Sequence, residues 1–277
     1  MRSALVLGGI LGSALALAGA GCDACEKDAP PHATKADGEA PDAPLASALA
    51  DVAEPPALPA NPVAREEKTI DIDGVKETWR LEWVRPPMPT CMGDEGLASC
   101  PCAAFAFGEV GDLDLVRVRP GSPDERLHLN PLFDEHDAKL RRWLPTAAEQ
   151  KALKAPSATE LQARAVAPIM TFADYDHDGR ATEFLLAVDS MPCGHVPTIV
   201  VGIDKKNPKL HAFSSAEKPE EPLTLERPGD WDKVKAKVPV DLTEIPCGDH
   251  AAEIETHVTV SIDDAGVHAN KTTKKCN

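Results

Sequence analysis

Residues 68–83 have the sequence KTIDIDGVKETWRLEW. In the first half, isoleucines alternate with polar residues up to a turn at Asp73, and in the second half Trp79, Leu81 and Trp83 alternate with charged residues. Two runs of period two around an Asp-Gly turn predict a β-hairpin with one face toward a core. Because Trp79 and Trp83 share that face, we expect both rings in the core, with stacking on a sugar as the alternative.

Outward from this hairpin, the same patterns predict an α+β fold that is predominantly β, with a few short helices. Further strands are expected over residues 103–107, 113–118, 168–172, 184–188, 198–203 and 254–262, and in a last segment that ends at Cys276. Helices are expected over residues 134–143, after capping boxes at 146–149 and 157–160, and from a cap at Asp230 to Val238. We expect one disulfide-stapled domain over residues 65–277, with a division near 145–165 as the alternative.

The start of the chain has the pattern of an export signal. One positive charge at Arg2 precedes an uncharged, glycine-interrupted apolar run over residues 4–20, which fits a signal peptide better than a membrane span. The residues up to Cys22 resemble a bacterial lipobox, which implies cleavage after residue 21 and a diacylglycerol on Cys22. Gly19 departs from the lipobox, which usually has an aliphatic residue there, so ordinary cleavage and secretion remain the alternative.

The next segment, residues 22–64, is predicted to be a disordered linker behind the lipid-anchored cysteine. Residues 23–64 contain 13 Ala and 8 Pro and no aromatic residue. Such a composition buries too little apolar surface to offset the entropy of ordering the chain. We therefore expect a tether that holds the domain away from a membrane.

The formal net charge of the 277-residue chain is −16. A surface this acidic repels phosphate backbones, so we expect no nucleic acid partner. It suits divalent cations or basic partners, although net charge also keeps proteins soluble without any partner. Aromatic residues make up only 4% of the chain, so the core must be built mainly from aliphatic side chains.

Eight cysteines fit an exported protein, because thiols in oxidising compartments form disulfides. The candidates for disulfides are Cys91, Cys100, Cys102, Cys193, Cys247 and Cys276. Closeness in sequence suggests that Cys91 pairs with Cys100 or Cys102. A shared Pro-Cys-Gly setting suggests, as a guess, that Cys193 pairs with Cys247.

Residues 174–183, DYDHDGRATE, carry oxygen ligands at alternate positions. A chain that curls at the glycine brings such oxygens together on one hard cation, and Ca²⁺ takes six to eight of them. The predicted ligands are the side chains of Asp174, Asp176 and Asp178, the carbonyl of Arg180, and the side chains of Thr182 and Glu183. His177 lies between ligand positions and is expected to point to solvent.

This segment resembles EF-hand loops and, since its flanks are strand-like, the β-flanked calcium loops of FG-GAP repeats. It departs from the EF-hand at position 12, where Leu185 replaces glutamate, and from FG-GAP loops because its last acid, Glu183, is at position 10 instead of 9. The resemblance implies a structural Ca²⁺. A plain acidic turn at Asp178-Gly179 remains the alternative.

Other clusters of reactive residues are less specific. Cys193, His195, Cys247 and His250 have ligand types that suit zinc, but disulfides are expected in an oxidising compartment. His195, Asp249 and His250 suggest a hydrolase, although the sequence has neither a Gly-x-Ser-x-Gly nor a His-Glu-x-x-His motif. Ser99-Cys100-Pro101-Cys102 lacks redox Cys-x-x-Cys spacing, so two cysteines with different disulfide partners are expected.

Together these patterns predict an exported, lipid-anchored, calcium-binding module of the cell envelope with no evident catalytic activity. The membrane is the expected partner, through the lipid on Cys22. The alternative function is a metal-dependent envelope hydrolase that uses the region of His195, Asp249 and His250. A soluble secreted protein is the alternative localisation.

Overall fold

The computed structural model describes residues 62–98, 102, 104–191, 195–264 and 266–276. The predicted signal peptide, Cys22 and nearly all of the predicted linker lie outside these residues, as do Cys100, Cys193 and the side chain of His250. The described chain is mostly β, as the sequence predicts, and the described residues belong to one compact unit. Among the described residues, no helix combines the length and the apolar character needed to cross a bilayer.

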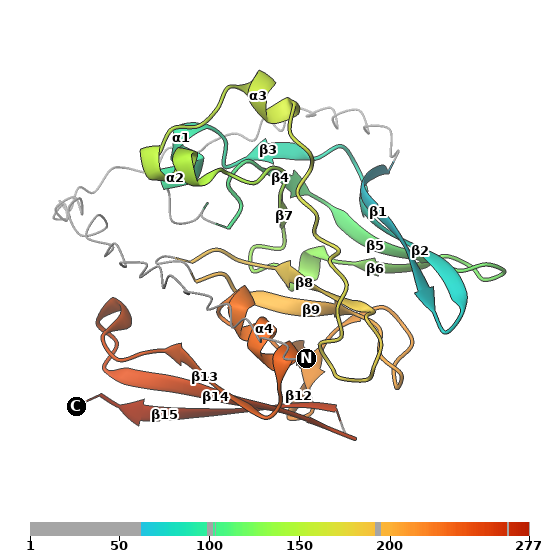
Figure 1. Cartoon of the computed structure of the whole chain (residues 1–277), viewed down its shortest axis with the longest axis vertical. Helices are drawn as coiled ribbons and strands as arrows, with labels where there is room; N and C mark the ends of the chain where they lie inside the picture. Colours follow the sequence, from blue (N-terminus) through green and yellow to red (C-terminus); the bar gives the residue numbers. More distant parts are fainter. Residues whose placement is uncertain (1–61, 99–101, 103, 192–194, 265, 277) are drawn as a thin grey trace, which may run out of the picture. The chain divides into compact units, whose positions relative to one another are not determined.

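Antiparallel sheets make up most of the fold (Figure 1). A four-stranded sheet has the order β1-β2-β5-β6, formed by Val63–Ile72, Val75–Trp83, Leu113–Val118 and Glu125–His128. A three-stranded sheet has the order β3-β4-β7, formed by Met88–Thr90, Gly108–Gly111 and Ala138–Arg141. The middle sheet has the order β10-β9-β8, formed by His211–Ala212, Thr198–Gly202 and Glu183–Ala187.

The C-terminal part adds a short hairpin and a further sheet. The hairpin pairs β11, Ser214–Ser215, with β12, Lys218–Pro222. The sheet has the order β13-β14-β15, formed by Val240–Ile245, Ile254–Asp263 and Gly266–Lys275. The described α-helices are short: α1, Gly93–Ala98; α2, Ala147–Ala152; α3, Ala158–Gln162; and α4, Pro228–Ala236. Short 3₁₀ helices cover Asn130–Leu132 and Asp249–Ala251.

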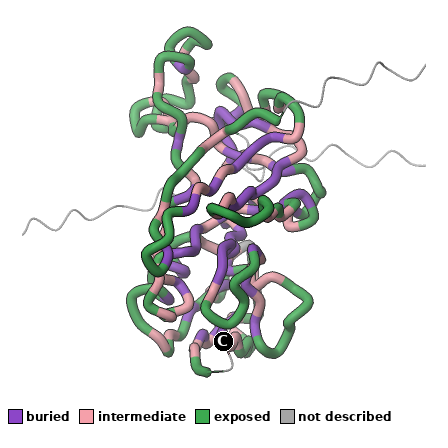
Figure 2. Tube along the Cα trace, turned by 90° about the vertical axis from the view of Figure 1, so that its right-hand side faces the viewer, coloured by how far each residue is buried: buried purple, intermediate pink, exposed green. Residues whose placement is uncertain are grey.

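Strand β9 joins two hydrophobic cores because all five of its residues are buried. Side chains alternate between the faces of a strand. Ile199 and Val201 accordingly pack in a first core with the tryptophans of β2, and Val200 packs in a second core with Trp231 of α4 and Val258 of β14. Figure 2 shows the buried residues mainly in the interior of the trace and the exposed residues mainly along its outer loops.

The predicted N-terminal hairpin is confirmed, with Asp73 and Gly74 between β1 and β2. Trp79 and Trp83 are 0% and 1% exposed, so both rings pack in the core and neither is available to stack on a sugar. An ion pair is buried beside them, since Arg117 Nε lies 2.5 Å from Glu77 Oε2. Arg117 Nη1 also donates to the carbonyl of Pro208 at 2.6 Å, which ties this sheet to the turn after β9.

Both capping boxes are confirmed. The hydroxyl of Thr146 accepts from the backbone of Glu149 at the start of α2, and the Glu149 carboxylate accepts from the backbone of Thr146. Ser157 and Glu160 make the same pair of hydrogen bonds at the start of α3. Each box satisfies two backbone donors that a helix start leaves unpaired, which is why so short a signal locates a helix.

The predicted helix over residues 134–143 is wrong, because this segment contains β7. Leu140 and Trp143 have helical spacing, but buried Ala138 and Leu140 alternate with partly exposed neighbours, which is strand periodicity. Strand β7 pairs with β4, which lies about 30 residues earlier in the chain. This pairing partner, which is distant in sequence, decides the conformation of the segment.

Two predicted strands and one predicted helix start also differ from the structure. Of the strand predicted over residues 103–107, the described residues 104–107 form turns, and the strand begins at Gly108, where a Cβ atom would lie 2.5 Å from the Phe105 carbonyl oxygen. Residues 168–172 form no strand. Helix α4 begins at Pro228, whose fixed φ suits a first helical turn, so Asp230 lies inside the helix instead of capping it.

Two disulfides staple the described residues. Cys91 bonds Cys102, one of the two partners expected for it. Cys247 bonds Cys276, so the suggested pairing of Cys193 with Cys247 is wrong. The second bond joins the turn after β13 to the end of β15, because antiparallel pairing of both strands with β14 brings those two ends to the same end of the sheet.

We expect the Cys247–Cys276 disulfide to stabilise the protein more than the Cys91–Cys102 disulfide. It closes 29 residues instead of 11, and loop-closure entropy then gives about 4 against about 3 kcal/mol. Urea unfolding of the Cys247→Ala/Cys276→Ala and Cys91→Ala/Cys102→Ala double variants measures both values. A larger loss in the second variant would contradict the entropic ranking.

Candidate metal centre

The loop over residues 174–183 is closed at its base by backbone pairing. Ala173 N donates to the Glu183 carbonyl at 2.8 Å, and Glu183 N donates back at 3.3 Å. Positive φ angles at His177 (57°) and Gly179 (88°) curl the chain between these ends. The first and tenth positions of the predicted calcium loop are therefore neighbours in space.

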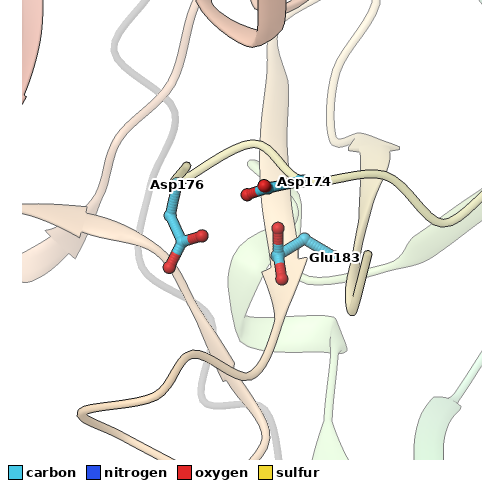
Figure 3. Close-up of side chains that lie close together, drawn as sticks. All are labelled: Asp174, Asp176 and Glu183. Atoms are coloured by element: carbon cyan, nitrogen blue, oxygen red, sulfur yellow. The ribbon is translucent and has the colours of Figure 1, made fainter. Parts of the chain in front are cut away.

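Three carboxylates meet inside this loop, from Asp174, Asp176 and Glu183 (Figure 3). One oxygen of each lies within 4.8 Å of the others. Backbone donors orient two of them, since Gly179 N bonds Asp174 Oδ2 and Asp178 N bonds Asp176 Oδ1, each at 3.0 Å. Glu183 begins β8 and is 0% exposed, so its carboxyl group lies inside the protein.

Polar partners satisfy Glu183 better than Asp174. Glu183 Oε2 accepts from Tyr175 N at 2.8 Å, and Glu183 Oε1 lies 2.5 Å from the Thr182 hydroxyl. Asp174 Oδ1 is buried and has no hydrogen-bond partner among the described residues. A buried acceptor without a partner costs about 1–3 kcal/mol. A cation bound between the carboxylates would remove that cost.

Without a metal ion, ionisation of all the carboxyl groups in the cluster is unfavourable. Burial, with added repulsion from neighbouring aspartates, raises the pKa of Glu183 to about 8, against the pull of hydrogen bonds from Thr182 and Tyr175. Burial likewise raises the pKa of Asp176 to about 6, and the charges of Asp178, Asp174 and Asp204 add to it. Close like charges that are shielded from water favour protonation or a bound cation.

The other predicted ligands lie around this cluster. Asp178 Oδ2 accepts from Lys205 N at 2.9 Å and its Oδ1 from Arg180 N at 2.8 Å, so this carboxylate is used within the scaffold. The Thr182 hydroxyl is buried and lies 2.9 Å from the Ile203 carbonyl. The structure thus brings together three of the six predicted ligands, whereas the Asp178 carboxylate bonds the turn after β9.

Three contacts fasten the loop to separate parts of the fold. Asp178 binds the turn after β9 through Lys205 N. The Arg180 side chain pairs with Asp73, in the β1–β2 turn, at 2.6 Å. His177 is exposed, as expected, and its Nε2 lies 2.8 Å from the Val234 carbonyl of α4. Sequence reasoning missed Lys205 and Val234, since nothing local marks contacts between residues 27 and 57 positions apart.

The second cluster of interest surrounds His195, which is 7% exposed. Its Nδ1 lies 3.2 Å from Glu226 Oε2, and its Nε2 lies 3.0 Å from Asp249 Oδ2. Both ring nitrogens therefore face carboxylates that belong to different segments. This arrangement favours a structural joint over a general base, which needs one ring nitrogen turned toward substrate.

The predicted zinc alternative is contradicted at Cys247. A thiolate is the zinc ligand, and Cys247 is bonded to Cys276. Cys102 of the Cys-Pro-Cys segment is bonded to Cys91, which agrees with a structural disulfide. Cys193, Cys100 and the side chain of His250 lie outside the described residues.

No protein-family model matches the chain, and no curated protein or solved structure matches it either.

In metal-free protein, Glu183 should make stability fall as pH rises. Its carboxyl loses a proton near pH 4.5 in the unfolded chain but near pH 8 in the folded one, so the unfolded state ionises first between these values. Below pH 4.5 both states keep the proton and the contribution is fully present. Urea unfolding in EDTA from pH 4 to 9 measures this slope.

The matched variant is Glu183→Gln, which keeps the shape and cannot ionise. It should lose the part of the pH dependence that Glu183 contributes. If the stability of the wild type instead changes with pH as that of Glu183→Gln does from pH 4 to 9, the pKa of the buried Glu183 carboxyl is not raised.

Proposed function

We propose that the protein is an exported calcium-binding module of the cell envelope, held at a membrane by a lipid on Cys22. The observation that carries the proposal is the convergence of Asp174, Asp176 and Glu183 around one space, with Asp174 Oδ1 buried and unpartnered. Carboxylate oxygens are ligands that Ca²⁺ accepts in its tolerant geometry. The role of the ion is structural.

Calcium suits this loop better than magnesium or zinc. Mg²⁺ demands a near-ideal octahedral site and keeps several waters, whereas Zn²⁺ prefers nitrogen and sulfur ligands in a tetrahedral site. The cluster offers only oxygen, from a loop and the first residue of a strand. Affinity in the range of extracellular modules, about 10⁻⁴ to 10⁻³ M, is expected for so few charged ligands.

Two further features support export. The Cys91–Cys102 and Cys247–Cys276 disulfides are typical of proteins from oxidising compartments. The apolar run that ends at Cys22 is typical of a lipoprotein signal. Millimolar free calcium outside the cytoplasm would also match a site of modest affinity.

Calcium should raise the melting temperature of the full chain. Binding only to the folded state stabilises it by about 2.7 kcal/mol when free calcium is about 100 times Kd. Thermal unfolding followed in EDTA and then in a calcium series measures this shift. The shift should vanish in Asp176→Asn and Glu183→Gln, which remove one ligand charge each.

The matched control is Asp134→Asn, an exposed aspartate away from the loop. It should keep the full calcium shift. If the wild type shows no shift at any calcium concentration, the loop is a plain acidic turn and the proposed calcium function is wrong. If Asp176→Asn responds like the wild type, the ion binds elsewhere.

Replacement of Cys22 should release the protein from the membrane. In a bacterial host that processes lipoproteins, radiolabelled palmitate should label the wild type and the Cys25→Ser control but not Cys22→Ser. Cell fractionation should then find Cys22→Ser in the soluble exported fraction. Unlabelled, soluble wild-type protein would instead indicate ordinary cleavage and secretion.

A further inference from the structure

A cavity of about 630 Å³ adjoins the carboxylate cluster. It is bounded by the calcium loop at Asp176, by the turn after β9 at Asp204, by β10–β11 at His211 and by the β14–β15 turn at Asp263. Ligand pockets typically enclose about 300–1,000 Å³, so a small molecule fits here. Segments from distant parts of the sequence thus enclose a space beside the proposed metal.

The cavity reaches the metal site through Asp176, the only one of the three clustered carboxylates in its lining. Asp176 Oδ1 accepts from Asp178 N, and Oδ2 accepts no hydrogen bond from the described residues. Three carboxylates supply three to six oxygens, whereas Ca²⁺ takes six to eight. A calcium ion held there would keep positions open to water or to oxygens of a ligand in the cavity.

The lining combines polar and apolar side chains. Asn207 and Ser214 offer hydrogen bonds, while Val238 and Ile262 present aliphatic surface. The His211 ring also lines the space and stacks on Phe213, with centroids 4.6 Å apart and planes inclined by 23°. A ligand with hydroxyl groups on its rim and an apolar face matches such a lining.

The charge of the lining disfavours an anion. Five aspartates line the cavity against two lysines, a formal excess of three negative charges. Both ammonium groups already donate to backbone carbonyls, Lys205 to Asp178 and Lys206 to Asp264. An anionic ligand would meet unfavourable potential even with one Ca²⁺ in place, whereas a neutral ligand with several hydroxyls would not.

We propose that this cavity binds a neutral saccharide, with two adjacent hydroxyl groups completing the coordination of the calcium ion at Asp176. The inference rests on the proposed calcium site and adds a ligand to it. The ion would then serve both to stabilise the loop and to bind the sugar. The apolar ring face would lie on the side of the cavity lined by Val238 and Ile262.

The test uses the full chain and a panel of methyl glycosides of mannose, galactose, glucose and fucose. Binding is followed by saturation-transfer NMR and calorimetry in calcium and in EDTA, with citrate as an anionic probe. At least one glycoside should bind in calcium and about tenfold more weakly or not at all in EDTA. Calcium binding is measured on the same samples.

The discriminating variant is Ala216→Trp. Ala216 is exposed, lines the cavity, is not a candidate calcium ligand, and keeps its place through a backbone bond from its N to the Val267 carbonyl at 2.8 Å. The indole should fill the cavity and weaken glycoside binding about tenfold, with calcium affinity unchanged within about twofold. Ala148→Trp, on exposed α2, is the matched control and should change neither.

The outcomes separate the two proposals. Calcium binding without glycoside binding would overturn the saccharide inference and leave the calcium site standing. Preferred binding of citrate, glycoside binding that is equal in EDTA, or full glycoside binding in Ala216→Trp would each overturn it as well. Absence of calcium binding would overturn both proposals together.

Discussion

The pairing of β8 with β9 is the constraint on which both cores depend. Strand β9 is buried on both faces, so its alternate side chains must satisfy two different packing environments at once. Gly202 ends the strand where any side chain would collide, since a Cβ atom would lie 2.4 Å from the Thr182 carbonyl oxygen. This close approach brings the end of β9 against the first residue of β8, which is Glu183.

Because β9 approaches β8 so closely, the Glu183 carboxyl group is buried. This burial is the basis of the candidate metal site. An ionised carboxylate inside a protein is costly unless it is paired or hydrogen-bonded, and Glu183 has donors from Tyr175 and Thr182 but no cationic side chain in an ion pair among the described residues. Asp174 and Asp176 add negative charge to the same space. The divalent cation that we propose would resolve this imbalance.

Local signals explain what could be predicted from the sequence. The hairpin around Asp73 and the capping box at Thr146 are specified by adjacent residues, and so is the spacing that brings Asp174 and Asp176 together. The strand at residues 138–141 could not be predicted, because its pairing partner β4 lies far away in the chain. For the same reason, no sequence pattern indicates the contact of Asp178 with the turn after β9, or the cavity beside that turn.

An ion bound in the loop over residues 174–183 would also affect residues outside the loop, because the loop contacts separate parts of the fold. Arg180 ties the loop to the β1–β2 turn, on the side of the first core, and His177 ties it to α4, which packs in the second. Arg117 adds a buried link from β5 to Pro208, in the segment that follows the turn held by Asp178. A cation that holds the three carboxylates together would therefore stabilise the joint between both cores, and the cavity beside Asp176 would keep its shape only while that joint is ordered.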